Sequence, residues 1–149
     1  MTEPLIRPVT PDDRAAWDRL YQGYARFYKV EQSDDMRDRV WTWLHDGAHE
    51  TQGLVAEGAG GTLIGLTHFR PFARPLSAST GCFLDDLFVA PEARGSGAAD
   101  ALIDGVRKIA LENGWSVVRW ITAENNYRGR GLYDRVATQT NWVTYDIKP

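Results

Sequence analysis

One stretch of the chain decides how the sequence is interpreted: residues 84–99, which read LDDLFVAPEARGSGAA. It predicts a strand that ends at Pro91, a turn containing Gly95 and Gly97, and then the start of a helix. The first N–H groups of a helix lack partners within it and carry partial positive charge, so a phosphate placed there gains several hydrogen bonds. Glycine lets the backbone approach such an anion closely because it has no Cβ. The stretch therefore predicts an anion-binding turn between a strand and a helix.

Two common phosphate-binding motifs do not fit this turn. A Walker loop would end in Gly-Lys-Ser or Gly-Lys-Thr, whereas Gly97 is followed by Ala98 and Ala99. A dinucleotide fingerprint would have a third glycine where the chain has Asp100. A Gly-x-Gly turn alone is equally typical of a strand–helix connection that binds nothing.

Strand and helix patterns alternate on both sides of this stretch. Strands are expected at 5–8, 53–57, 63–70, 82–89, 117–122 and 142–147, and helices at 10–28, 34–44, 97–113 and 126–136. Residues 71–80, with two prolines and several small side chains, are expected to form a surface loop. This order predicts an α/β domain in which helices pack on a central mixed sheet.

Composition narrows the class of protein. The 149 residues, 43% hydrophobic and 25% charged, predict one globular domain over 1–149. A net charge of −3 argues against nucleic acid as a partner. We expect no leader peptide, because the first residues, MTEP, show no basic region followed by an apolar run. We expect no membrane span, because no apolar run approaches about 20 residues. The single cysteine, Cys82, predicts a reducing, cytoplasmic setting, and the three histidines show no metal-ligand spacing, so we expect no metal.

Residues 87–99 resemble the coenzyme A site of the GNAT N-acetyltransferase superfamily. The family signature Gln/Arg-x-x-Gly-x-Gly/Ala is matched by RGSGAA at 94–99, and LFVAP at 87–91 is similar to the family's strand ending in Val-x-Pro. The resemblance implies a GNAT-like, mainly antiparallel sheet flanked by helices, with acetyl-CoA as co-substrate. It further implies that the pantetheine arm pairs with the backbone of Leu87, Phe88 and Val89. The pyrophosphate would be held by the turn, made of Arg94, Gly95, Ser96, Gly97, Ala98, Ala99 and Asp100.

A second patch, Asn126-x-x-Gly129-x-x-Leu132-Tyr133, is similar to the family's Asn-x-x-Ala-x-x-Leu-Tyr. The resemblance implies that Asn126 contacts the pantetheine and that Tyr133 protonates the departing thiolate. The chain departs from the family in having Gly129 for alanine and in lacking Gly-Phe after Tyr133. The run LYDRV at 132–136 is most similar to the yeast Hpa-type branch, which modifies polyamines and histone-like amines.

The implied reaction is direct attack of a primary amine, on a small molecule or a lysine-like side chain, on the thioester. An alkylamine is mostly protonated at neutral pH, so a base must remove a proton. Asp86 is the favoured base, with Asp85 or a water relay as alternatives, and strand alternation predicts that the two aspartates face opposite sides of the sheet. Cys82 has no histidine near it in sequence, which argues against a nucleophile.

Two other functions fit the same sequence. One is a non-catalytic acyl-CoA-binding sensor with this fold, and the other is a structural or interaction module. The expected strand 142–147 also suggests a homodimer, which is compatible with each of these functions.

Overall fold

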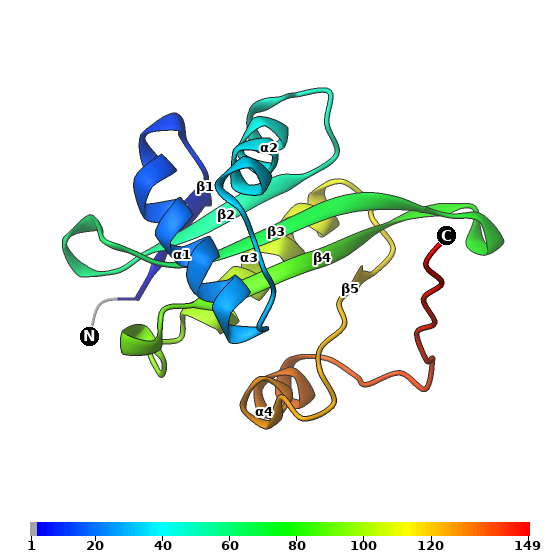
Figure 1. Cartoon of the computed structure of the whole chain (residues 1–149). Coiled ribbons are helices and arrows are strands. Elements are labelled where there is room, and N and C mark those ends of the chain that lie inside the picture. The colour runs from blue at the N-terminus through cyan, green and yellow to red at the C-terminus, as the bar shows by residue number, and fades with distance from the viewer. Residues whose placement is uncertain (1–2) are drawn as a thin grey trace.

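The computed structural model describes residues 3–149, which form one sheet with helices on both faces (Figure 1). The helices and strands are, in chain order, β1 (Leu5–Pro8), α1 (Arg14–Phe27), α2 (Asp34–His45), β2 (Gln52–Glu57), β3 (Leu63–Arg74), β4 (Ser79–Val89), α3 (Ala98–Glu112), β5 (Val118–Arg119) and α4 (Tyr127–Val136). The strands lie side by side in the order β1-β2-β3-β4-β5, antiparallel except for the parallel pair β4–β5. The predicted mixed, mainly antiparallel sheet flanked by helices is confirmed.

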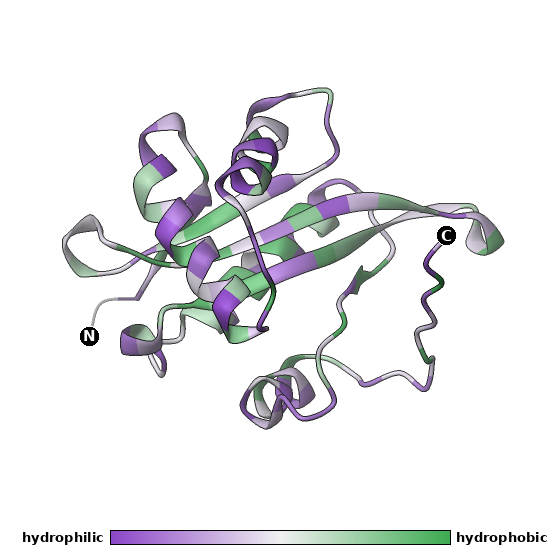
Figure 2. Ribbon diagram, in the orientation of Figure 1, coloured by the Kyte–Doolittle hydropathy of each residue, from purple (hydrophilic) through white to green (hydrophobic). Residues whose placement is uncertain are grey.

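Two apolar clusters hold the helices to the sheet, one on each face (Figure 2). On the α1 side, Trp17 is fully buried against the cluster that includes Val55 and Leu66. On the α3 side, Leu102 and the rest of its apolar stripe pack on a cluster that includes Leu54. Neighbouring residues of β2 thus enter opposite clusters, as the period-two geometry of a strand requires.

An ion pair between Arg7 on β1 and Asp13 holds the start of the first helix against the sheet. The Asp13 carboxylate accepts hydrogen bonds from the Thr10 backbone N–H at 2.8 Å and from the Arg7 guanidinium at 2.7 and 2.8 Å. Bonds from Arg7 lower the pKa of Asp13 from 3.8 to about 2. A short turn of 3-10 helix at Pro11–Asp13 precedes α1, which confirms the predicted helix start near residue 10.

The predicted surface loop at 71–80 is wrong. β3 and β4 continue to the end of a long hairpin, paired as far as Arg74 and Ser79, and the turn takes only Pro75–Ser77 and Ala78. Pro71 lies within β3 opposite Cys82. Proline has no backbone N–H to donate at this position, but the strand continues through it.

The two expected strands near the C-terminus differ most from the structure. The strand expected at 117–122 is reduced to Val118–Arg119, which pair with Cys82 and Phe83 before β4 and β5 separate. The strand expected at 142–147 is not formed, because residues 137–149 run clear of the sheet and have no strand partner within residues 3–149. No helix in that described part of the chain is long and apolar enough to cross a membrane.

Candidate active site

The main cleft opens where β4 and β5 separate. It encloses about 1050 Å³ between the end of α1, residues 87–89 of β4, the turn before α3, and α4. The structure brings to this cleft Tyr133 and each residue that the sequence predicted for coenzyme binding, namely Leu87, Phe88, Val89, Arg94, Gly95, Ser96, Gly97, Ala98, Ala99, Asp100 and Asn126. Asp86, the predicted base, lies one residue beyond the cleft lining and faces an adjoining cavity.

The glycines of the turn adopt a conformation that other residues avoid. Gly95 and Gly97 both have φ of 85°, and a Cβ built on either would meet nothing within 4 Å. Glycine is therefore needed for the left-handed backbone, and the space beside it is open. Gly97 precedes the first residue of α3, and the Ala98 N–H donates to Ser96 Oγ at 3.3 Å. The N–H groups of Ala99 and Asp100, also in the first turn, have no hydrogen-bond partner within residues 3–149, and both residues line the cleft. Arg94 is held at the rim with its guanidinium 5.7 Å from the Phe27 ring centroid.

One edge of β4 is left without a strand at the cleft. Residues 87–89 pair with β3 along one side, Leu87 opposite Thr67 and Val89 opposite Gly65. β5 pairs only with residues 82 and 83 of β4, so the backbone groups on the other side of 87–89 have no strand partner within residues 3–149. Such an edge can take an extended amide-bearing chain as an added strand.

Asn126 fixes the helix that forms the far wall of the cleft. Its side chain accepts a hydrogen bond from the Gly129 N–H at 3.3 Å and donates one to Thr122 Oγ1 at 2.9 Å. A Cβ on residue 129 would lie 2.5 Å from Asn126 Nδ2, so an alanine there would displace the cap. Gly129, where the sequence departs from the family pattern, leaves room for the Asn126 side chain in this position.

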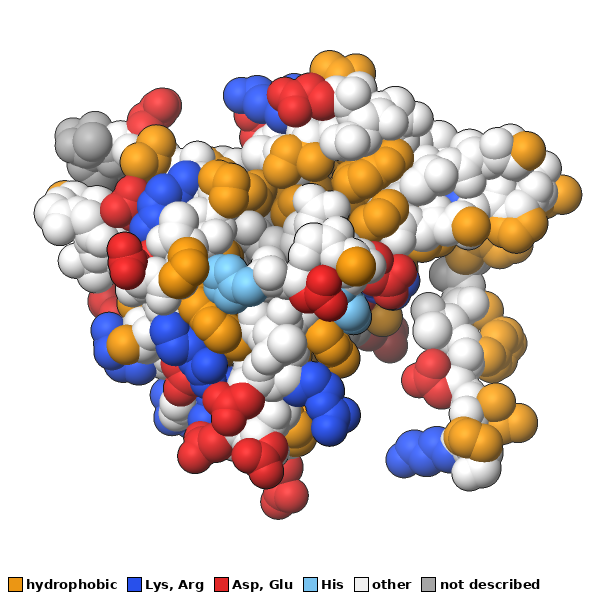
Figure 3. Space-filling model, turned by 90° about the horizontal axis from the view of Figure 1, so that it is seen from above, with side chains coloured by type: hydrophobic (Ala, Val, Ile, Leu, Met, Phe, Trp, Pro, Cys, Tyr) orange, Lys and Arg blue, Asp and Glu red, His pale blue; other side chains and the backbone are white. Residues whose placement is uncertain are grey.

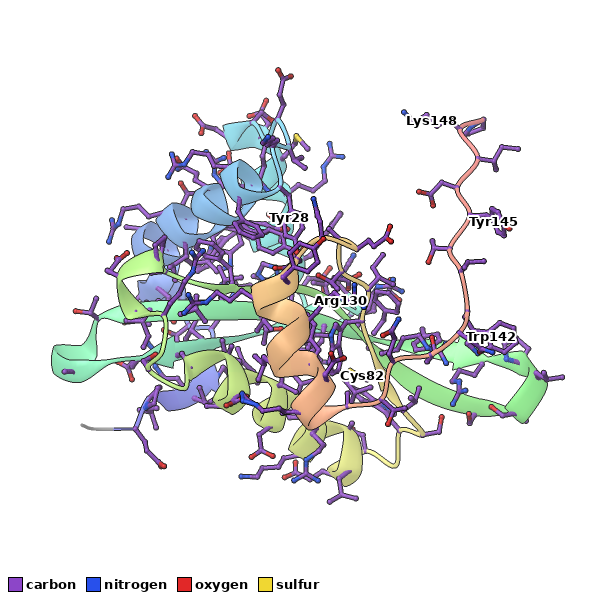
Figure 4. All side chains as sticks on the ribbon, turned by 90° about the horizontal axis from the view of Figure 1, so that it is seen from below. Tyr28, Cys82, Arg130, Trp142, Tyr145 and Lys148 are labelled. Atoms are coloured by element: carbon purple, nitrogen blue, oxygen red, sulfur yellow. The ribbon has the colours of Figure 1, made fainter. Side chains whose placement is uncertain are left out.

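Tyr133, the predicted proton donor, lines the cleft. Its ring packs edge-on against Trp120 with centroids 5.4 Å apart, and Tyr28, at the end of α1, lines the same cleft (Figure 4). Burial, with a smaller contribution from the neighbouring Tyr28, raises the pKa of Tyr133 to about 12. The phenol therefore keeps its proton at neutral pH.

A second cavity of about 310 Å³ adjoins the cleft at Asp86, next to Leu87. It lies on the α1–α2 side of the sheet, where acidic and histidine side chains gather among hydrophobic ones (Figure 3). Its walls are Tyr21, Val40, Trp43, His49, Glu50, Thr51, His68, Arg70, Asp85 and Asp86.

Asp86 ends a buried hydrogen-bond chain. Trp17 Nε1–H donates to His68 Nε2 at 3.0 Å, so that nitrogen holds a lone pair and the ring proton is on Nδ1. His68 Nδ1 then donates to Asp86 Oδ2 at 2.8 Å, and the Tyr21 hydroxyl donates to the same oxygen at 2.9 Å. Burial works to raise the pKa of Asp86, but the bonds from His68, Tyr21 and Tyr24 outweigh it and lower the pKa. Asp86 is therefore an oriented carboxylate that stays ionised.

Asp85 faces the same cavity as Asp86, which corrects the expectation that they face opposite sides of the sheet. The register of β3 against β4 shifts at this point, since His68 pairs with Asp86 and Phe69 pairs with Leu84. The extra residue is Asp85, and such a bulge breaks the alternation of side chains. Arg70 donates to Asp85 Oδ2 at 3.0 Å. Burial raises the pKa of Asp85, and Arg70 opposes the rise.

Sequence reasoning missed the supporting residues Trp17, His68 and Arg70. His68 lies on the strand that pairs with the strand carrying the two aspartates. Its contact with Asp86 could be predicted only if the register of the hairpin were known. Cys82 is buried in the α3-side cluster, and burial raises its pKa to about 11, which makes it a poor nucleophile. No cluster of three metal-ligating side chains forms within the described residues.

Comparisons with known proteins agree with this geometry. The profile of the Acetyltransferase (GNAT) family matches residues 17–137. A D-amino-acid N-acetyltransferase of Saccharomyces cerevisiae is 28% identical over 142 residues, covering 95% of this chain and 88% of that protein. An uncharacterised N-acetyltransferase of Bacillus subtilis, YhfO, is 32% identical over 130 residues, 87% of this chain and 86% of its own.

Solved structures show the same fold. A ribosomal-protein-alanine N-acetyltransferase from Brucella melitensis superposes with a TM-score of 0.78 at 25% identity, over 97% of this chain and 98% of that one. AAC(6')-Iy, solved with a bisubstrate analogue of CoA, superposes with a TM-score of 0.84 at 20% identity over 99% of both chains. The chain belongs to the GNAT family and is an N-acetyltransferase.

Proposed function

We propose that this protein transfers the acetyl group of acetyl-CoA to a primary amine, on a small molecule or a lysine-like side chain, by direct attack on the thioester. The observation that carries the proposal is that consecutive residues of β4 line two cavities, Leu87–Val89 the main cleft and Asp85 and Asp86 the second cavity. One offers a glycine turn and an unpaired strand edge for the coenzyme, and the other offers the ionised carboxylate of Asp86 for an amine.

The coenzyme is proposed to lie along the main cleft. The first-turn amides at Gly97–Asp100 would hold the pyrophosphate, with Arg94 at the rim adding a charge-assisted contact. The pantetheine arm would pair with the backbone of 87–89 and pass Asn126 on its way to the end of the cleft nearest Asp86. This path supports acetyl-CoA as the co-substrate.

The protein's own groups supply the proton transfers. Asp86, ionised and oriented by His68 and Tyr21, attracts the ammonium and takes its proton, which frees the lone pair for attack. A backbone N–H near Leu87 stabilises the oxyanion that forms on the acetyl carbonyl. When the carbon–sulfur bond breaks, Tyr133 donates its proton to the thiolate. The amine nitrogen, which still carries one extra proton after the attack, returns that proton to the tyrosinate through solvent, so neutral N-substituted acetamide and thiol leave. Asp86 then releases to solvent the proton that it took from the ammonium.

The acceptor cavity supports a small cationic amine. Its volume of about 310 Å³ is that of a small-molecule site, and Asp85, Asp86 and Glu50 outnumber its one guanidinium, Arg70. The relative from Saccharomyces cerevisiae is named for D-amino acids, which are small amines. We therefore rank a small-molecule acceptor above a lysine side chain in a protein.

A thiol-release screen tests the proposal. Acetyl-CoA is offered with polyamines, L- and D-amino acids, aminoglycosides and lysine peptides, and release above the rate without amine is expected for at least one small amine. Coenzyme binding is read separately as a rise in Tm with CoA. Binding without thiol release from any amine would indicate the sensor instead, and no rise in Tm would exclude both.

The reducing, cytoplasmic setting also remains a proposal, supported by the buried thiol of Cys82 and tested by cell fractionation.

A further inference from the structure

The indole of Trp17, on α1, makes one polar contact in the core. Trp17 is fully buried, and its Nε1–H donates to His68 Nε2 at 3.0 Å. A buried indole N–H needs an acceptor, and the Nε2 lone pair of His68 supplies it. His68 itself is 1% exposed, so solvent does not compete for this nitrogen. The bond therefore controls the state of the imidazole at Nε2, while Nδ1 faces Asp86.

Only one of the three forms of an imidazole fits between Trp17 and Asp86. The imidazolium and the tautomer protonated on Nε2 both carry a hydrogen that would point at the hydrogen of the indole. The tautomer protonated on Nδ1 has a lone pair for Trp17 and presents its hydrogen to Asp86 Oδ2, 2.8 Å away. Trp17 therefore excludes both the second proton and the other tautomer of His68.

The neutral form of His68 decides how much negative charge Asp86 presents. A neutral N–H orients the carboxylate and leaves its charge in place. An imidazolium would put a positive charge beside Asp86 Oδ2, where it would repel an ammonium ion and make the carboxylate a weaker base. A carboxylate this close favours the imidazolium, so a histidine in this place needs a group that prevents its protonation.

We propose that Trp17 is a positioning residue for the acceptor site: its indole N–H keeps His68 neutral, so that His68 does not neutralise the charge with which Asp86 meets the amine. Trp17 lies outside the lining of both cavities and acts only through His68. The role of Asp86 as base rests on the proposed function, whereas the state of His68 does not depend on it.

Other groups near His68 also carry charge or titrate. Tyr21 meets the His68 ring edge-on, with centroids 4.7 Å apart, and burial raises the pKa of Tyr21, so its hydroxyl stays protonated. From β2, the residue opposite His68 is Gly53, which has no side chain to titrate. The remaining titratable groups around His68 and Asp86 are Tyr24, His49, Glu50, Arg70 and Asp85. All of them are unchanged in the variants below, so their titration appears in the wild-type profile as well.

Nitrogen-15 NMR of the wild-type protein with labelled histidine reads the state of His68 without coenzyme or amine. Between about pH 5 and pH 8, where histidine ordinarily titrates, the ring is expected to keep a proton on Nδ1 and none on Nε2. The three histidine signals are assigned with His45→Gln and His49→Gln. An imidazolium, or a proton on Nε2, at any pH in this range overturns the proposal.

Trp17→Phe removes the N–H and keeps an aromatic ring in the cluster. The backbone carbonyl of Asp86 accepts a hydrogen bond from Thr67 Oγ1 at 2.7 Å, which holds residue 86 in place without Trp17. Thiol release by Trp17→Phe is expected to stay within about threefold of wild type near pH 9 and to fall about tenfold or more below it near pH 6, where His68 can take a second proton. The KM for the amine should rise at the lower pH, and the rise in Tm with CoA should not change.

Trp41→Phe is the matched control. Trp41 packs on Trp17 with ring centroids 4.9 Å apart, while His68 Nε2 is occupied by the Trp17 N–H. The same substitution at Trp41 therefore disturbs the same cluster without freeing His68, and its pH profile is expected to match that of the wild type.

The outcomes separate control of a proton from packing. A loss in Trp17→Phe that is equal at every pH, or the same acid loss in Trp41→Phe, shows that Trp17 acts through packing and overturns the proposal. If circular dichroism shows that Trp17→Phe does not fold, the wild-type NMR spectra decide. Thiol release from no amine would count against the proposed function, and the NMR spectra would still decide the state of His68.

Discussion

Replacing Asp86 with asparagine should separate the chemistry of the site from its architecture. The amide oxygen that the Asp86→Asn change introduces would still accept the bonds that His68 and Tyr21 donate at 2.8 and 2.9 Å, while the negative charge is lost. Loss of a general base lowers the rate by about 10²–10⁴, equivalent to about 3–5 kcal/mol of transition-state stabilisation.

The effect on stability should be much smaller. Two hydrogen bonds to a charged group become bonds to a neutral one, at a cost of about 1 kcal/mol each. The amide no longer carries a buried charge, which offsets part of that loss. A net loss below about 2 kcal/mol lowers Tm by less than about 8 °C for a chain of this size, so the variant stays folded at assay temperature.

The assay is thiol release as a function of pH with the best amine from the screen. Because the pKa of Asp86 is lowered, the carboxylate stays ionised over pH 5–9 and can take the proton of the bound ammonium. The wild-type rate should therefore change little over this range, whereas the rate of Asp86→Asn should rise with the fraction of free amine. The deficit of Asp86→Asn should shrink as the pH approaches the amine pKa of about 10, where free amine is supplied by solvent. Asp85→Asn is the matched control. A rate for Asp86→Asn within about twofold of wild type at pH 7, with a large loss in Asp85→Asn, would refute the assignment.

Three further outcomes are expected. Gly97→Glu adds a negative charge and a strained left-handed residue at the turn, so the rise in Tm with CoA should vanish in calorimetry. An unchanged affinity for CoA would show that the turn does not bind the pyrophosphate. Tyr133→Phe should lower kcat about 10²-fold or more while CoA affinity stays within a few-fold, and an unchanged kcat would exclude the phenol as proton donor. In the folded state the pKa of Asp13 is lowered from 3.8 to about 2, so the ion pair with Arg7 stabilises the fold above pH 4. This stabilisation is lost as the pH falls toward 2. Acid titration of the free energy of unfolding should show a loss of about 2 kcal/mol over this range. Asp13→Asn should flatten that titration, and an unchanged slope would contradict the role of the pair.

Features that arise from residues close together in the chain could be predicted from the sequence. The glycine turn at Gly95 and Gly97, the amphipathic α3 behind it and the helix α4 all depend on residues a few positions apart, and each lies within one or two residues of its predicted place. The role of Asn126 as the N-cap of α4 was not predicted. For that reason the residues predicted to surround the coenzyme come together in one cleft.

The way in which distant segments meet could not be predicted, because it depends on strand register and packing in the folded protein. His68 and Asp86 are 18 residues apart, and their pairing follows from the register of a hairpin whose end was expected to be a loop. Because of the bulge at Asp85, the side chains of Asp85 and Asp86 line the same cavity, although strand alternation predicts that they face opposite sides of the sheet. The pattern at 142–147 is that of a strand, yet strand formation needs a hydrogen-bonding edge in reach, and residues 3–149 of one chain do not bring an edge to it.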